Sequence, residues 1–166
     1  MTTEQELRDA LKGAFQLRAR MYYYIFCELR DALGEEKATD LMKRAIARGG
    51  RDASDRFKRY APGNMEGLKE DFLNGMPDNG SLFQPEVCAC SRETGLEIQF
   101  HACPLKEVYE AMGLSDEEKA KMLAIASAID HGLFTGAGFE FSAETWKPGR
   151  DGCCRLHVKP GKPVVS

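Results

Sequence analysis

The sequence predicts an α+β fold, in which N-terminal helices precede an antiparallel sheet of about four strands with helices packed on one face. Apolar side chains recur every three or four positions through the first 33 residues, which is the spacing of one helix face. After residue 82, short segments of alternating polar and apolar residues are separated by turn-forming residues, as expected of strands. Because hairpins and helices alternate along the chain, the strands should pair antiparallel and keep one face for the helices.

The N-terminal half should be helical. Leu7 and Phe15 belong to an apolar pattern that runs without proline until Gly34 provides a stop, so one long helix is expected over 4–33. We expect Gly49-Gly50 to end the second helix. The other segments expected in this half are a helix over 35–46, its continuation after a bend over 51–60, a break at 61–64, a helix over 65–72 and a turn at 77–80.

The C-terminal half should contain the sheet. Residues 96–101 alternate strictly between apolar and polar side chains, which makes them the strongest strand candidate. Pro104 suits the first turn of a helix, and Ser115 with Glu118 has the pattern of a capping box that begins another. The remaining segments expected are strands over 87–91, 139–146 and 153–159, and helices over 104–112 and from 115 towards His131.

The chain should form a single domain over residues 1–166, with a helical half at about 1–80 and an α+β half at about 83–160. Its net charge of −3 argues against a nucleic-acid partner, because phosphate binding requires clustered Lys and Arg. No segment approaches the ~20 apolar residues that span a bilayer, and residues 1–6 are unlike a signal peptide. We therefore expect a cytoplasmic protein that acts on a small molecule, without a nucleic-acid or membrane partner. Homo-oligomerisation stays open.

Cysteines are the main candidates for chemistry. There are six of them, and in a reducing compartment cysteines are more often free, catalytic or metal-bound than disulfide-linked. Cys103 directly precedes Pro104, about where a helix N-cap belongs, and backbone N–H groups there stabilise a thiolate. His101 lies two residues earlier and could take the thiol proton. The alternative is that Cys103 is a small buried residue at the end of a strand.

Asp130 and His131 form a second candidate pair. They should end a largely apolar helix, just before a glycine-rich turn at 136–138. The Asp130 carboxylate there would orient a base or hold a polar substrate. His131 is explained equally well as a favourable positive charge at the C-terminus of the helix.

The cysteines also suggest a metal site. Zinc would accept Cys88, Cys90, Cys103 and either Cys153 or Cys154 as four tetrahedral ligands. In strand geometry Cys88 and Cys90 share a face, whereas Cys153 and Cys154 should point to opposite faces. The C-x-C spacing differs from the usual C-x-x-C of zinc sites. No phosphate-binding glycine loop, G-x-S-x-G or H-E-x-x-H motif occurs in the chain.

Four short blocks follow one another in the C-terminal half: His101-Ala102-Cys103-Pro104-Leu105, Met112-Gly113-Leu114-Ser115, Asp130-His131-Gly132 and Gly149-Arg150-Asp151-Gly152-Cys153-Cys154-Arg155-Leu156. In order and approximate spacing, from about residue 85 to 159, they resemble the L-2-amino-thiazoline-4-carboxylic acid hydrolase family. The resemblance implies a small cytoplasmic hydrolase. Such an enzyme opens the ring of a cyclic amidine thioether and gives an N-carbamoyl amino acid.

The resemblance also implies site residues. Cys103 carries over from the Cys-Pro block, Cys153 from the Gly-x-Asp-x-Cys block, and Asp130 from an acidic position after the intervening helix. The family often has an aspartate directly after the last cysteine, whereas this chain has Cys154 there. No role for that carboxylate can therefore be carried over. The last block also resembles the end of 4-vinyl-reductase-like ligand-binding domains, some of which hold zinc through cysteines.

Two functions are consistent with these patterns. The first is a small hydrolase that opens a cyclic amidine, or a related C–N or C–S bond, by cysteine- or metal-assisted hydrolysis. Its catalytic candidates are Cys103, Asp130, His101 and Cys153. The alternative is a non-catalytic small-molecule- or zinc-binding module of the sensor type. A thiolate mechanism requires no cofactor, whereas the metal version would use zinc held by Cys88, Cys90, Cys103 and Cys153.

Overall fold

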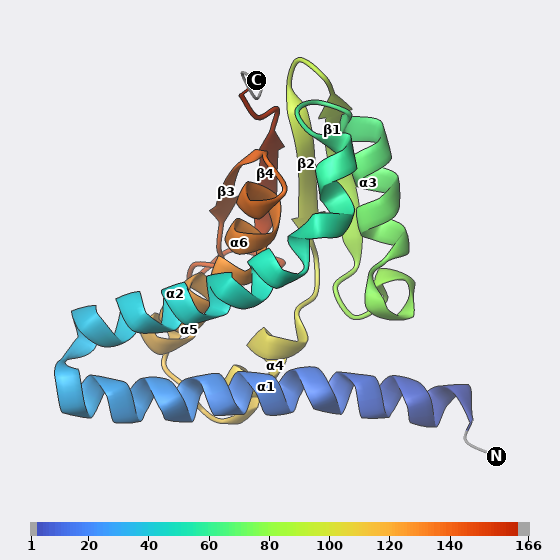
Figure 1. Cartoon of the computed structure of the whole chain (residues 1–166). Coiled ribbons are helices and arrows are strands. Elements are labelled where there is room, and N and C mark those ends of the chain that lie inside the picture. Colours follow the sequence, from blue (N-terminus) through green and yellow to red (C-terminus); the bar gives the residue numbers. More distant parts are fainter. Residues whose placement is uncertain (1–2, 163–166) are drawn as a thin grey trace.

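A computed structural model describes residues 3–162 and confirms the α+β class (Figure 1). Four antiparallel strands form one sheet in the order β1-β2-β4-β3. The strands are β1 (Pro85–Ser91), β2 (Gly95–Phe100), β3 (Glu140–Glu144) and β4 (Arg155–Lys159). The α-helices are α1 (Glu4–Leu33), α2 (Glu35–Asp52), α3 (Met65–Asn74), α4 (Pro104–Ala111), α5 (Asp116–Ala126) and α6 (Ala128–Gly136). Two 3-10 helices are η1 (Ser54–Tyr60) and η2 (Pro77–Gly80).

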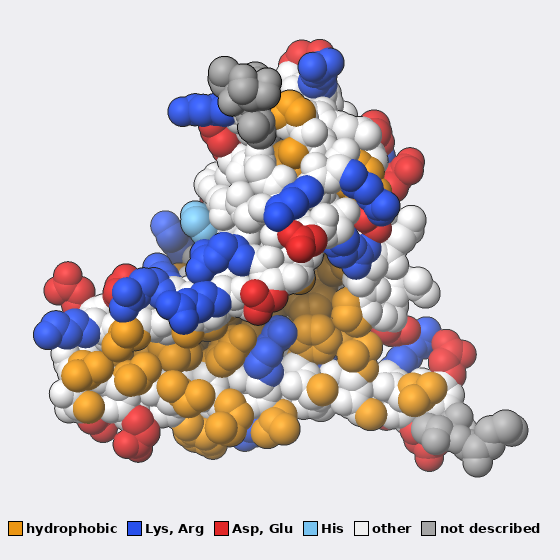
Figure 2. Space-filling view, viewed as in Figure 1, with side chains coloured by type: hydrophobic (Ala, Val, Ile, Leu, Met, Phe, Trp, Pro, Cys, Tyr) orange, Lys and Arg blue, Asp and Glu red, His pale blue; other side chains and the backbone are white. Residues whose placement is uncertain are grey.

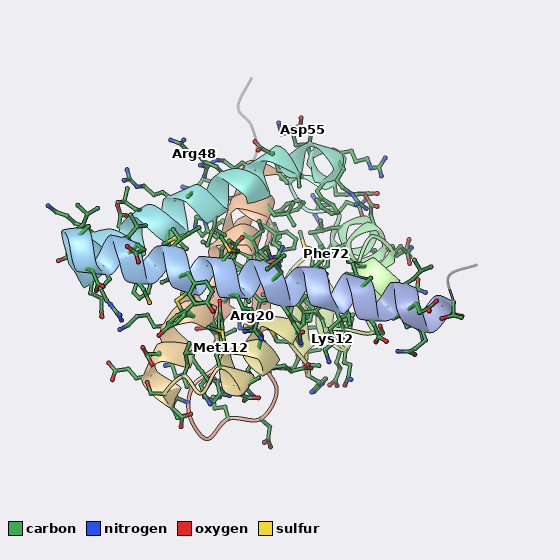
Figure 3. All side chains as sticks on the ribbon, turned by 90° about the horizontal axis from the view of Figure 1, so that it is seen from below. Lys12, Arg20, Arg48, Asp55, Phe72 and Met112 are labelled. Atoms are coloured by element: carbon green, nitrogen blue, oxygen red, sulfur yellow. The ribbon has the colours of Figure 1, made fainter. Side chains whose placement is uncertain are left out.

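Helix α1 has the bounds that the sequence predicted. Thr3 and Glu6 form a capping box at its start, and the chain leaves the helix at Gly34, whose φ of 85° favours glycine. α1 runs along one side of the molecule and α2 returns above it (Figure 1). Seen from below, α1 crosses in front of the other helices, with α2 on one side and α4 and α5 on the other (Figure 3). The long helix therefore contacts both halves of the chain.

The expected end of α2 at Gly49-Gly50 is wrong, because the helix continues to Asp52. A Cβ atom on Gly50 would lie 2.0 Å from the carbonyl oxygen of Ile129 in α6. A Cβ atom on Gly132 in α6 would lie 2.0 Å from the carbonyl oxygen of Ala47 in α2. These glycines allow the two helix backbones to approach each other, and they do not act as stops.

The single helix expected from residue 115 towards His131 is two helices. Ser115 begins α5 with the predicted capping box to Glu118. The chain bends at Ser127, whose hydroxyl donates to the Ala124 carbonyl at 2.9 Å, and α6 then continues past His131 to Gly136. The bend matters for the site because it sets the direction of α6, which carries Asp130.

The sheet packs one face against the helices. Leu96 and Ile98 of β2 and Leu156 and Val158 of β4 are buried on that face, where α3 and α6 contact the sheet. Strands β3 and β4 are shorter than the expected 139–146 and 153–159.

Strand β1 contains a β-bulge. Its register shifts between Val87 and Ala89, so Cys88 has no partner of its own in β2. An extra residue in a strand changes which residues share a face. Among residues 3–162, no helix is both long enough and apolar enough to cross a membrane.

Candidate active site

A cavity of about 310 Å³ lies among the helices at one end of the sheet. α1, η1, α3, α5, α6 and the loops before α4 and β4 contribute to its wall, which is mostly apolar and aromatic. Figure 2 shows a hollow lined with hydrophobic side chains directly above α1. The polar and thiol side chains at the cavity are Arg18, Arg56, Cys103, Ser127, Asp130, Cys153 and Cys154. A mostly apolar pocket of this volume with a few polar groups is typical of a small-molecule site.

Cys103 is the N-cap residue of α4, and Pro104 is the first helical residue, as predicted. Its thiolate form is favoured by the neighbouring Cys153 thiol and by the backbone N–H groups of Lys106 and Leu105, although no capping hydrogen bond to the Cys103 side chain is formed. Together these donors lower the pKa of Cys103, although burial of its side chain opposes the shift. Cys103 therefore lies at a helix N-terminus with a pKa below that of a free thiol.

Cys153 lies in the loop before β4 and faces Cys103. Its backbone N–H donates to the Phe100 carbonyl at 2.9 Å, which ties the loop to the end of β2. The neighbouring Cys103 and Cys154 thiols, together with burial, raise the pKa of Cys153 above that of a free thiol. The Sγ atoms of Cys153 and Cys154 are 3.3 Å apart. The expectation that these two side chains diverge is wrong, because both residues precede β4 and are not paired strand residues.

Asp130 lines the cavity from α6. Removal of its carboxyl from bulk water raises its pKa from 3.8 to about 7, while the positive charge of Arg18 acts in the opposite direction. A carboxyl group with a pKa near 7 can give and take a proton at neutral pH. The cavity thus contains a thiol with a lowered pKa and a carboxyl group with a raised pKa.

The structure does not place His101 beside Cys103, contrary to the prediction that His101 could take the thiol proton. Its ring is exposed at the end of the sheet, where Nε2 lies 2.6 Å from a carboxylate oxygen of Glu86. It is not among the residues that line the cavity.

The four-cysteine zinc set does not assemble. Cys88 is exposed on β1, and Cys90 faces Glu66 of α3 instead of the cavity. The bulge breaks the regular alternation of β1 at Cys88, which lies near Arg155 on the open face of the sheet. The expectation that Cys88 shares a face with Cys90 is therefore wrong. Within residues 3–162, no three side chains of His, Cys, Asp or Glu are grouped so that they could hold a metal ion.

Arg18 is a cavity residue that sequence reasoning missed, as it missed Arg56 and Ser127. It lies on α1 between Phe15 and Tyr22, three residues after one and four before the other, and so on the same helix face. An arginine inside an otherwise aromatic helix face was the pattern that could have identified it.

Comparison with known proteins identifies the family. The sequence model of L-2-amino-thiazoline-4-carboxylic acid hydrolase matches residues 14–158, which include every cavity residue described above and confirm the resemblance. No curated protein and no solved structure gives a significant match. The chain therefore belongs to the L-2-amino-thiazoline-4-carboxylic acid hydrolase family, and is a hydrolase of a small-molecule substrate.

Proposed function

We propose that the protein opens a small cyclic amidine by nucleophilic catalysis, with Cys103 as the nucleophile. The observation that carries the proposal is the position of this sulfur at the N-cap of α4 on the cavity wall, beside three possible donors, two backbone N–H groups of α4 and the Cys153 thiol. Such donors stabilise a thiolate without a neighbouring imidazole. His101 therefore has no part in the proposed reaction, and Cys153 acts by holding the thiolate in place.

The substrate class follows from the family and the cavity. L-2-amino-thiazoline-4-carboxylate, the compound in the family's name, contains a ring carbon bonded to two nitrogens and one sulfur. In its protonated amidine form this carbon is electron-poor and open to attack by a thiolate. A mostly apolar cavity of about 310 Å³ suits a ring of this size.

The reaction takes place in two stages. The Cys103 sulfur bonds to the amidinium carbon, the ring C–S bond breaks, and Asp130 gives its proton to the departing ring sulfur. Water then attacks the same carbon, Asp130 takes a proton from it, and the bond to Cys103 breaks, which restores the thiolate. The product is an N-carbamoyl amino acid with a free thiol, and the amidinium proton passes to solvent. One water molecule is consumed.

Asp130 suits both proton transfers because its pKa is raised to about 7. Near neutral pH, comparable fractions of the carboxyl are protonated and ionised, which is the condition for efficient general acid and base catalysis. All six cysteines are free thiols, which supports a reducing compartment such as the cytoplasm.

The test compares Cys103→Ser with Cys88→Ser, whose thiol is exposed on β1 outside the cavity. With L-2-amino-thiazoline-4-carboxylate in ¹⁸O-labelled water, the wild-type enzyme and Cys88→Ser should form the carbamoyl product with one labelled oxygen. Cys103→Ser should form none while it keeps the wild-type circular dichroism spectrum. Full turnover by Cys103→Ser would exclude the thiolate mechanism.

A further inference from the structure

Arg18 presents an uncompensated positive charge to the cavity. Its side chain lines the cavity from α1, and its Nε atom is buried without a hydrogen-bond partner. Within residues 3–162 the guanidinium forms no ion pair. The residue as a whole is half-buried, and a guanidinium that is partly removed from water is stabilised by an anionic partner, because desolvation of a charge is costly.

The guanidinium is held in place by aromatic rings. Its central carbon lies 4.8 Å from the centre of the Phe15 ring and 5.9 Å from that of Tyr22. Both rings come from the same face of α1, so the helix itself orients the guanidinium. Stacking occupies the face of a guanidinium and leaves its N–H groups in the plane free for an acceptor.

Among the described residues, no neighbouring carboxylate forms an ion pair with Arg18. Asp130 is near enough for Arg18 to lower its pKa, yet no ion pair joins them. Arg56, the other arginine at the cavity, is already engaged, with its Nη2 2.6 Å from the Asp71 carboxylate. Arg18 is therefore the cavity cation whose partner is missing from the described chain.

We propose that Arg18 binds the carboxylate of the substrate, so that the cavity selects small zwitterions. The cavity then offers Arg18 to a carboxylate and the Cys103 thiolate to a cation. A ring with a carboxylate at one end and an amidinium at the other matches both. The inference rests on the proposed function for the amidinium end, whereas the carboxylate end rests on Arg18 alone.

The experiment measures binding of two ligands that differ only in the carboxylate: L-2-amino-thiazoline-4-carboxylate and 2-amino-thiazoline. Isothermal titration calorimetry is carried out on the full chain with Cys103→Ser, alone and combined with Arg18→Met, Arg18→Lys or Arg20→Met. Arg18→Met keeps an apolar chain of similar length against Phe15 and Tyr22. Arg20, labelled in Figure 3, is an exposed arginine of the same helix and provides the control.

Arg18→Met should weaken binding of the carboxylate ligand roughly 10- to 100-fold, the range for a hydrogen bond to a charged group, and change binding of 2-amino-thiazoline less than about twofold. Arg18→Lys should recover part of the loss, and Arg20→Met should leave both affinities unchanged. Equal effects of Arg18→Met on both ligands would overturn the inference. So would the same affinity of the unsubstituted cavity for both ligands, or no binding of the carboxylate ligand.

The two proposals can fail separately. A carboxylate ligand that binds through Arg18 but is not hydrolysed by the wild-type enzyme supports the Arg18 site and contradicts the proposed reaction. Hydrolysis of both ligands with the same KM, unaffected by Arg18→Met, supports the reaction and contradicts the Arg18 site.

Discussion

Replacing Asp130 by asparagine should make the stability of the protein depend less on pH. Burial raises the pKa of this carboxyl from 3.8 to about 7, so between these values the folded protein holds a proton that the unfolded chain has released. The contribution of Asp130 to stability is therefore fully present below about pH 4 and is lost as the pH rises towards 7. One pKa unit corresponds to about 1.4 kcal/mol, so a shift of about three units gives an upper limit near 4 kcal/mol at pH 8.

Asp130 keeps some accessible surface because it lines the cavity, and water there reduces this cost. We therefore expect Asp130→Asn to raise the free energy of unfolding by about 2 to 4 kcal/mol at pH 8, relative to its effect at pH 4. Urea unfolding followed by the fluorescence of Trp146, the single tryptophan, measures this difference at each pH. Asp52→Asn, at an exposed position at the end of α2, should show less than about 0.5 kcal/mol of such change. An effect of Asp130→Asn that is the same at pH 4 and pH 8 would refute the raised pKa.

Three further predictions follow from local contacts. Gly132→Ala should lower the free energy of unfolding by about 3 kcal/mol or more, because the new methyl group meets the backbone of α2. Gly13→Ala, in open space on α1, should raise it by about 0.5 to 1 kcal/mol. Urea unfolding of both variants checks this, and equal effects would contradict it. Iodoacetamide at pH 7 should modify Cys103 faster than Cys153, because the pKa of Cys103 is lowered and that of Cys153 is raised. Peptide mass spectrometry gives the two rates, and faster labelling of Cys153 would reverse the assignment. Ser115→Ala should cost about 1 kcal/mol through loss of the N-cap of α5, and Ser115→Asn should restore most of it in the same unfolding assay.

The parts of the fold that depend on local pattern could be predicted from the sequence. The bounds of α1, the capping box at Ser115 and the alternation in β2 arise from neighbouring residues. Gly49-Gly50 and Gly132 could not be interpreted this way. A glycine that ends a helix and a glycine that lets two helices touch look the same in the sequence, and only the crossing of α2 with α6 distinguishes them.

The site likewise has features that the sequence could predict and features that it could not. The N-cap position of Cys103 could be derived from its place before Pro104, and the structure agrees. Cys153 was joined to Cys103 only by the zinc hypothesis and by the family resemblance, because 50 residues separate the two in the chain and no local pattern connects them. The bulge at Cys88 and the inward position of Arg18 depend on tertiary packing, so spacing alone could not reveal them.

The bulge at Cys88 has a consequence for self-association. β1 and β3 are the two outer strands of the sheet, and a regular outer strand offers a row of unpaired N–H and C=O groups to another chain. In β1 the bulge interrupts this row, and Pro85 at the start of the strand has no N–H to donate. β3 is only five residues long and has a glutamate at each end. Both outer edges thus resist continuous strand addition, which protects the folded protein against the edge-to-edge aggregation to which open sheets are prone.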